Sequence, residues 1–160
     1  QQSTSENKST WSQVLGEDKE ITDNHYFARF QVLSGSLEFY SLEFKVFDDG
    51  VGFRYVFPDW AGIDSLLIQD ELTEFNFAQD YLSWWIPNDW DSYERIYQTT
   101  PLSKSPGVNT PFTLRTESGI HISIHEANLT EYSGMTLVPD TVGSTNWHAA
   151  LVPWPAAGSL

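Results

Sequence analysis

The sequence predicts an all-β protein built as an antiparallel β-sandwich. Two observations carry this prediction: short segments in which apolar and polar residues alternate, and turn residues that separate those segments at regular intervals. A third is the apolar content, 40% of 160 residues with 15% aromatic, which is enough for a packed core. No segment has the periodicity of a long helix, and residues 64–72, the nearest candidate, are expected to form a loop or a single turn.

The N-terminal half contains three predicted strands. Residues 1–10 are polar and are expected to form a flexible segment ahead of one β-sandwich domain over residues 11–160. The predicted strands cover residues 26–33, 36–47 and 51–57. Within the second strand the alternation changes phase near Tyr40–Ser41, which predicts a β-bulge or a hairpin-like bend. Asp48-Asp49-Gly50 predicts the turn that follows this strand.

The C-terminal half predicts further short strands. They cover residues 71–77, 81–86, 93–98, 112–116, 120–125 and 135–138. Glu117-Ser118-Gly119 separates two of them and predicts a hairpin. Many short strands with regular turns are typical of a sandwich or a barrel.

Charge and composition exclude several functions. The chain has 22 acidic and 8 basic residues and a net charge of −14, which repels the phosphates of nucleic acids and of anionic membranes. No apolar run has the length of a membrane span. Cysteine is absent, so a disulfide, a thiolate zinc site and a cysteine nucleophile are all impossible. We therefore expect neither a nucleic-acid nor a membrane partner.

His121 and His125 would share one face if they lay on a helix, as zinc-binding histidines do. Here Ile120, Ile122 and Ile124 alternate with polar residues, which predicts a strand. A strand rises about 3.3 Å per residue, so the two histidines would lie about 13 Å apart and could not ligate one ion. The pair is therefore expected to lie on the polar face of a half-buried strand. A metal site formed by one of these histidines, Glu126 and remote ligands stays open.

Glu126 is the best candidate for a functional residue. It lies where the apolar strand ends and a polar loop begins, a position where binding sites are often built. A carboxylate suits Ca²⁺, but that ion needs several oxygens, so the other ligands would come from elsewhere. Glu71/Glu74 and Asp89/Asp91 are further carboxylate pairs whose spacing alone predicts no catalytic couple.

Several segments together carry a family resemblance. They are WSQVLG (11–16), FDDGVGFRYVF (47–57), ELTEFNF (71–77), YERIY (93–97), NTP (109–111) and IHISIHEANLTEYSGMTL (120–137). With these segments, residues 11–138 resemble the N-terminal domain of glycoside hydrolase family 97, the bacterial Ca²⁺-dependent α-glucosidases and α-galactosidases. DDGVGFRY followed at a distance by HEANLTEYSGM is the most specific part.

The resemblance implies a galactose-mutarotase-like supersandwich that packs on a catalytic (β/α)₈ barrel. Such enzymes act on the ends of oligosaccharide substrates and are periplasmic or secreted. The resemblance places the catalytic carboxylates mainly on the barrel, so no catalytic residue is expected in this chain. It assigns Glu126 to the calcium ion, and His125, Asn128 and Tyr132 to the substrate pocket.

The family pattern is matched only in part. Strands that precede the segment at Trp11 in the family, and the barrel itself, have no counterpart in these 160 residues. The chain is therefore expected to be an incomplete sandwich, inactive as a glycosidase by itself. Two other functions stay open: a free-standing carbohydrate-binding module, and a mutarotase-like epimerase with His121 or His125 as acid or base. In the module, sugars would stack on Trp84, Trp85 or Trp90, although buried tryptophans could equally fill the core.

Overall fold

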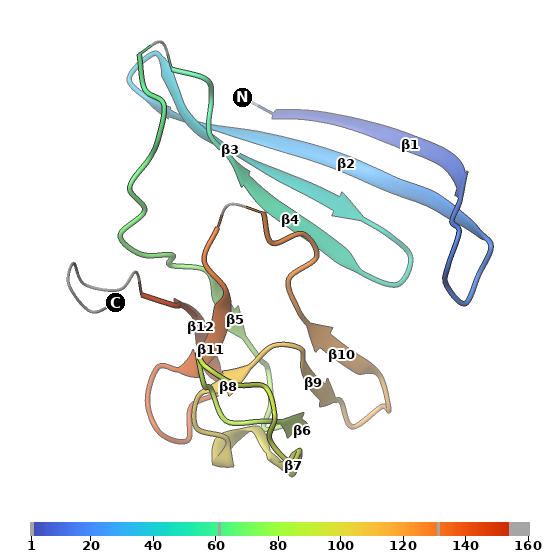
Figure 1. Ribbon diagram of the computed structural model, residues 1–160, viewed down its shortest axis with the longest axis vertical. Coiled ribbons are helices and arrows are strands. Elements are labelled where there is room, and N and C mark those ends of the chain that lie inside the picture. The colour runs from blue at the N-terminus through green and yellow to red at the C-terminus, as the bar shows by residue number, and fades with distance from the viewer. Residues whose placement is uncertain (1, 61, 131, 154–160) are drawn as a thin grey trace. The chain divides into compact units, whose positions relative to one another are not determined.

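The computed structural model describes residues 2–60, 62–130 and 132–153 (Figure 1). Within these ranges the regular structure is β-strand, apart from one short 3-10 helix, η1 (Leu102–Lys104). The all-β prediction is therefore confirmed. Instead of one domain over residues 11–160, the chain divides into two compact units, Gln1–Leu66 and Leu67–Leu160, called unit 1 and unit 2 below. No helix in the described ranges is long and apolar enough to cross a bilayer.

Unit 1 is a four-stranded antiparallel sheet in which each strand pairs with the next along the chain (Figure 1). Its strands are β1 (Gln2–Ser12), β2 (Glu20–Ser34), β3 (Leu37–Val46) and β4 (Val51–Val56). The turn from β2 to β3 contains Gly35, whose φ of 64° is a left-handed conformation that glycine adopts without steric cost. The predicted turn after β3 is confirmed, because the Phe47 amide donates to the Gly50 carbonyl at 2.8 Å.

The predicted bulge in β3 is also confirmed. Val32 pairs with Tyr40 and Leu33 pairs with Glu38, so Phe39 is the extra residue. An inserted residue exchanges the two faces of a strand, which is the phase change seen in the sequence.

The flexible segment expected over residues 1–10 is a wrong prediction, because β1 occupies these positions from Gln2 onward. The strand pairs with β2 along its whole length, from Gln2 opposite Phe30 to Ser12 opposite Glu20. Every side chain of β1 is exposed, so no apolar alternation marks it in the sequence. Backbone N–H and C=O groups pair whatever the side chains are, and this pairing builds the strand.

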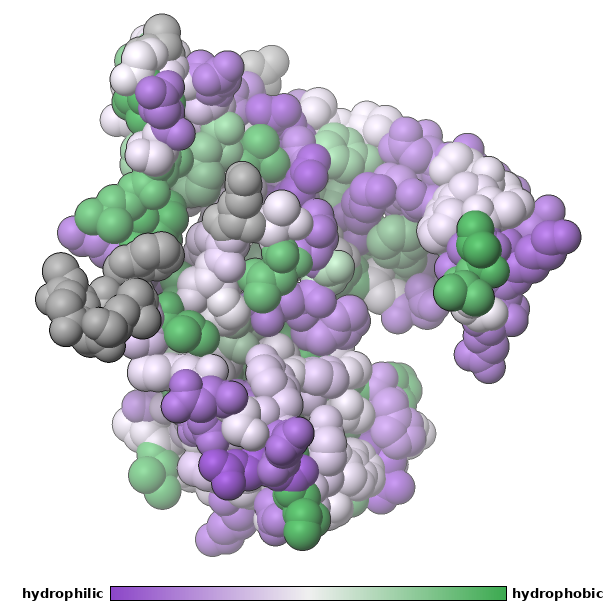
Figure 2. Space-filling view, viewed as in Figure 1, coloured by the Kyte–Doolittle hydropathy of each residue, from purple (hydrophilic) through white to green (hydrophobic). Residues whose placement is uncertain are grey.

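The two faces of the unit 1 sheet differ in character. By register, one face presents aromatic side chains: Tyr26, Phe30, Phe44, Phe53 and Tyr55. The other face carries ion pairs, with 2.8 Å between Arg29 and Glu38 and 2.8 Å between Arg54 and Glu43. Much of the aromatic face is exposed. The space-filling view shows hydrophobic residues at the surface of the molecule among hydrophilic ones (Figure 2).

Unit 2 contains two four-stranded antiparallel sheets, in the orders β10-β9-β6-β7 and β5-β12-β11-β8. The strands are β5 (Glu74–Asn76), β6 (Leu82–Trp85), β7 (Gln98–Pro101), β8 (Val108–Asn109), β9 (Phe112–Arg115), β10 (His121–Ile124), β11 (Met135–Pro139) and β12 (Asn146–Leu151). The predicted hairpin is confirmed, since β9 and β10 pair from His121 opposite Arg115 to Ile124 opposite Phe112.

The core of unit 2 joins its two sheets. Phe112 from one sheet stacks on Trp147 from the other, with ring centroids 5.3 Å apart, and both side chains are fully buried. The remaining buried members of this cluster are Trp85, Leu102, Val108, Leu114 and Leu137. Two antiparallel sheets that share one apolar core form a sandwich, so the predicted architecture is confirmed.

In unit 2 one predicted strand is displaced and one observed strand was not predicted. The strand expected over residues 93–98 is displaced, because β7 begins at Gln98. The residues before it form a loop in which Arg95 pairs with Asp89 at 2.5 Å. Strand β12 was not predicted, although Trp147 and Ala149 alternate inward along it. Its place between β5 and β11 depends on pairing with distant segments, which local alternation does not reveal.

Candidate functional site

Glu126 lies just beyond β10 and is half-buried. Its Oε1 atom accepts a hydrogen bond from the Met135 amide at 3.0 Å, and its Oε2 atom accepts a longer one from the Thr110 hydroxyl at 3.5 Å. The carboxylate therefore links the end of β10 to the segment before β9 and to the first residue of β11. These bonds hold the side chain in one place at the strand ends.

The environment of Glu126 disfavours its charged form. Burial raises the pKa of this carboxyl above its ordinary value of 4.5. The hydrogen bonds from Met135 and Thr110 act in the opposite direction but do not cancel the effect of burial. The negative charge of Glu71 raises the pKa further. Glu126 is thus a carboxylate that a nearby positive charge would stabilise.

Glu71 is the second carboxylate of this site. Its Oε2 atom accepts a hydrogen bond from the Tyr132 hydroxyl at 2.9 Å, and its Oε1 atom accepts one from Thr73 at 2.6 Å. Glu71 is 55 residues from Glu126 in the sequence, so local spacing could not pair them. It was noted in the sequence beside Glu74, whereas in the structure its relevant neighbour is Glu126.

The three residues predicted to line the pocket have different hydrogen-bond partners in the structure. Tyr132 lies at the site, because its hydroxyl contacts Glu71. The His125 ring is exposed, and its Nδ1 atom lies 3.2 Å from the backbone oxygen of Glu126 rather than from the carboxylate. Asn128 is exposed, and its side-chain oxygen accepts a hydrogen bond from Thr130 at 3.0 Å. Tyr132 is thus joined to the carboxylate pair, whereas the hydrogen bonds of the other two residues lead to the loop itself.

The donor set at Glu126 fits a partial calcium site. Carboxylate oxygens are hard ligands that suit Ca²⁺, and two neighbouring carboxylates attract a divalent cation. An ionised carboxylate has about four lone-pair positions, so the two hydrogen bonds that Glu126 accepts leave room for a metal bond. Among the described residues no group of three or more His, Cys, Asp or Glu side chains could hold a metal. A calcium ion needs about six to eight oxygens, so most would have to come from outside these residues.

The two-histidine zinc site was excluded on strand geometry, and β10 includes His121 as that reasoning required. The His121 ring lies beside Trp84, with 5.9 Å between ring centroids. His125 lies past the end of the strand. The two rings thus have separate neighbours.

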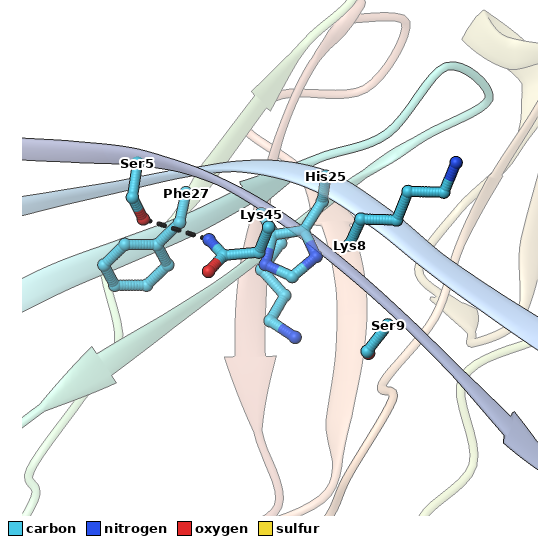
Figure 3. A pocket seen from close by; sticks show the side chains of 7 residues that line it. Ser5, Lys8, Ser9, His25, Phe27 and Lys45 are labelled. Atoms are coloured by element: carbon cyan, nitrogen blue, oxygen red, sulfur yellow. Dashed lines mark hydrogen bonds between the residues drawn. The ribbon is translucent and has the colours of Figure 1, made fainter.

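A depression of about 550 Å³ lies on unit 1 (Figure 3). Its lining residues include His25, Lys45 and Ser5. The His25 ring is hydrogen-bonded to Asp23, and this bond, followed by that from Lys45, lowers the pKa of Asp23. His25 and Lys45 already pair with Asp23, so this depression is a weaker candidate than the carboxylate pair.

Comparisons with known proteins agree with this fold. Residues 1–155 match the family described as "Glycosyl-hydrolase 97 N-terminal". Similar solved structures include a glycoside hydrolase family 97 enzyme from Pseudoalteromonas sp. strain K8 in complex with acarbose, a variant of that enzyme, and another variant in complex with panose. Each is 39% identical to this chain with a TM-score of 0.84, and the match covers 96% of this chain and 24% of that one.

The class of protein that the fold defines is an antiparallel β-sandwich. The chain belongs to glycoside hydrolase family 97 and corresponds to its N-terminal domain. It spans about a quarter of the length of the solved relatives, so the rest of their chains lies outside the match. The family resemblance of the sequence is therefore confirmed.

Proposed function

We propose that this chain is the non-catalytic β-sandwich portion of an exo-acting, Ca²⁺-dependent α-glycosidase. The portion would pack on a catalytic (β/α)₈ barrel and lend Glu126 to the calcium ion at the active site. The observation that carries this proposal is the carboxylate of Glu126, which is fixed by Met135 and Thr110 and lies near the charge of Glu71. The acarbose and panose complexes of the related enzyme favour an oligosaccharide with α-glycosidic bonds as substrate.

Each residue would have a defined task in this site. The amide of Met135 orients the Glu126 carboxylate so that its remaining lone pairs can meet a cation. Tyr132 donates to Glu71 and holds that second carboxylate in place. When bound, calcium would supply a positive charge that positions and polarises an oxygen of the substrate. His125 and Asn128 are exposed in the adjoining loop and would face the sugar.

Calcium binding by the 160-residue chain tests the role of Glu126. We expect weak binding in calorimetry, of millimolar order, because one or two carboxylates are a small part of a calcium shell. Glu126→Gln should weaken it further, whereas Glu74→Gln, the matched control on β5, should not. Submicromolar affinity, or equal binding by wild type and Glu126→Gln, would contradict the proposal.

An activity assay tests the proposal that the catalytic residues lie on the barrel and not in this chain. The chain alone should not hydrolyse p-nitrophenyl α-glucoside or α-galactoside, because a glycosidase needs a pair of catalytic carboxylates across the scissile bond and the proposal places these on the barrel. Measurable hydrolysis by the pure chain would contradict it.

We also propose a bacterial, periplasmic or secreted location for the enzyme, where it would meet oligosaccharides outside the cytoplasm. Cell fractionation followed by detection with an antibody would test this location.

A further inference from the structure

Two adjacent tryptophans of unit 2 have opposite environments. Side chains alternate along β6, so Trp85 points into the core and is 7% exposed, while Trp84 lies on the outer face of the sheet. The indole N–H of Trp85 donates to Thr100 at 3.0 Å. Among the described residues, the indole N–H of Trp84 has no hydrogen-bond partner. Since none of the buried side-chain nitrogen and oxygen atoms of these residues lacks a partner, this N–H is reached by solvent. Trp84 is therefore a half-buried ring on the outer face of the sheet, with an unused donor.

Arg115 lies against this ring. Its guanidinium carbon is 5.7 Å from the ring centre of Trp84. Among the described residues, the other three arginines, Arg29, Arg54 and Arg95, each pair with a carboxylate, whereas Arg115 pairs with none. A guanidinium stacked on an aromatic ring keeps its N–H groups free at its edge. Arg115 thus adds several unused donors beside Trp84.

The register of the sheet adds further polar groups to the same face. Arg115 pairs with His121, and Thr113 pairs with both Trp84 and Ser123, so these side chains share one side of the sheet. The His121 ring lies 5.9 Å from that of Trp84, with 34° between the planes. The hydroxyls of Thr113 and Ser123 lie 3.2 Å apart and are exposed. The aromatic ring is therefore flanked by donors and acceptors on β9 and β10.

On the other side of Trp84, strand β7 places Thr99 opposite the indole. Threonine is too small to cover an indole ring. A depression of about 660 Å³ also begins at Arg115 and is lined by Gln79, Asp80 and Glu117, among others. Its volume falls within the range of about 300–1,000 Å³ of small-molecule pockets. The surface thus offers a ring to stack on and a polar hollow beside it.

We propose that Trp84, Arg115 and His121 form a surface site for a neutral oligosaccharide. The apolar face of a sugar ring would stack on the indole, and its hydroxyls would pair with Arg115, His121 and the hydroxyls of Thr113 and Ser123. Anionic ligands are disfavoured, because Asp80 and Glu117 line the adjoining depression and the chain carries a net charge of −14. The choice of an α-linked glucan as ligand rests on the proposed function. The site shares no residue with the Glu126 site.

The test is a titration of the ¹⁵N-labelled 160-residue chain with maltoheptaose, followed by NMR. We expect the indole N–H of Trp84 and the side-chain N–H of Arg115 to shift and to saturate at millimolar ligand. Trp84→Ala should weaken binding by about tenfold or more, the effect of one lost stacking contact. Thr99→Phe, which covers the indole from β7 without touching the core, should also abolish the shifts. Arg115→Lys should weaken binding several-fold, because the charge remains but the fork of donors is lost.

Matched controls keep the outcomes distinct. Trp90→Ala removes an exposed tryptophan elsewhere in unit 2 and should leave the affinity unchanged. Trp84→Ala should leave calcium binding unchanged in calorimetry, so a loss of calcium binding and a loss of sugar binding can be told apart. The proposal is overturned if maltoheptaose causes no shift at Trp84, if Thr99→Phe and Arg115→Lys bind like wild type, or if oligogalacturonate binds more tightly than maltoheptaose.

Discussion

The two units reach stability by different means. In unit 2 two sheets enclose their own core, and Phe112, Leu114 and Trp147 are completely buried. In unit 1 one sheet has an aromatic face on which Tyr26 is 63% and Phe53 is 41% exposed, while its polar face carries ion pairs. The buried side chains of unit 2 thus contribute far more apolar burial per residue. The same alternation of residues therefore produces a closed sandwich in one unit and an open amphipathic sheet in the other.

The largest expected effect comes from truncating one aromatic residue in each unit. Phe112→Ala should lower the free energy of unfolding of unit 2 by about 3–5 kcal/mol, because it leaves a cavity against Trp147. Phe53→Ala should cost unit 1 about 1 kcal/mol or less, because its ring is already partly in water. Hydrogen exchange followed by mass spectrometry reports on each unit separately. Equal losses in the two units would contradict the contrast drawn above.

A smaller effect is expected from acid on unit 1. The Ser41 hydroxyl, and then Arg29, lower the pKa of Glu38 below its ordinary 4.5. The resulting stability is present above pH 4.5 and is lost as pH falls through the lowered pKa. Glu38→Gln should therefore reduce the Tm at neutral pH and flatten its fall in acid.

The matched control for this acid effect is Glu6→Gln, an exposed substitution on β1 of the same unit. It should follow the wild-type profile of Tm against pH. A profile of Glu38→Gln that runs parallel to wild type would show that the contacts of Glu38 contribute nothing to the acid response.

The smallest effect concerns the carboxylate pair of unit 2, where the sign is reversed. The raised pKa of Glu126 means that the folded state binds this proton more tightly than the unfolded state. Its contribution to stability therefore decreases as pH rises from 4.5 through the raised pKa. Glu71→Gln should lower the pKa of Glu126 by removing a neighbouring negative charge, as measured by ¹³C NMR of the carboxyl group. Glu74→Gln is the control, and an equal change in both variants would argue against direct coupling between Glu71 and Glu126.

The sequence predicted the elements whose signals are local. The alternation near Tyr40–Ser41 indicated the bulge at Phe39, and Glu117-Ser118-Gly119 indicated the hairpin of β9 and β10. The end of the apolar run also indicated that Glu126 would lie just beyond a strand. Strands β1 and β12 were missed because pairing with other strands defines them: β1 has no buried side chain, and β12 lies between two distant segments.

By itself, the sequence determined the β-class, the positions of most turns and the family, and it singled out Glu126 as a candidate. A period of two residues also required Trp84 and Trp85 to face opposite sides of their strand. Only the tertiary structure decided which of them is buried, since that depends on the second sheet behind β6. It also decided that Glu71 is the carboxylate that influences Glu126. The physical reason is the same in both cases: local alternation sets the two faces of a strand, whereas packing between distant segments decides what each face meets.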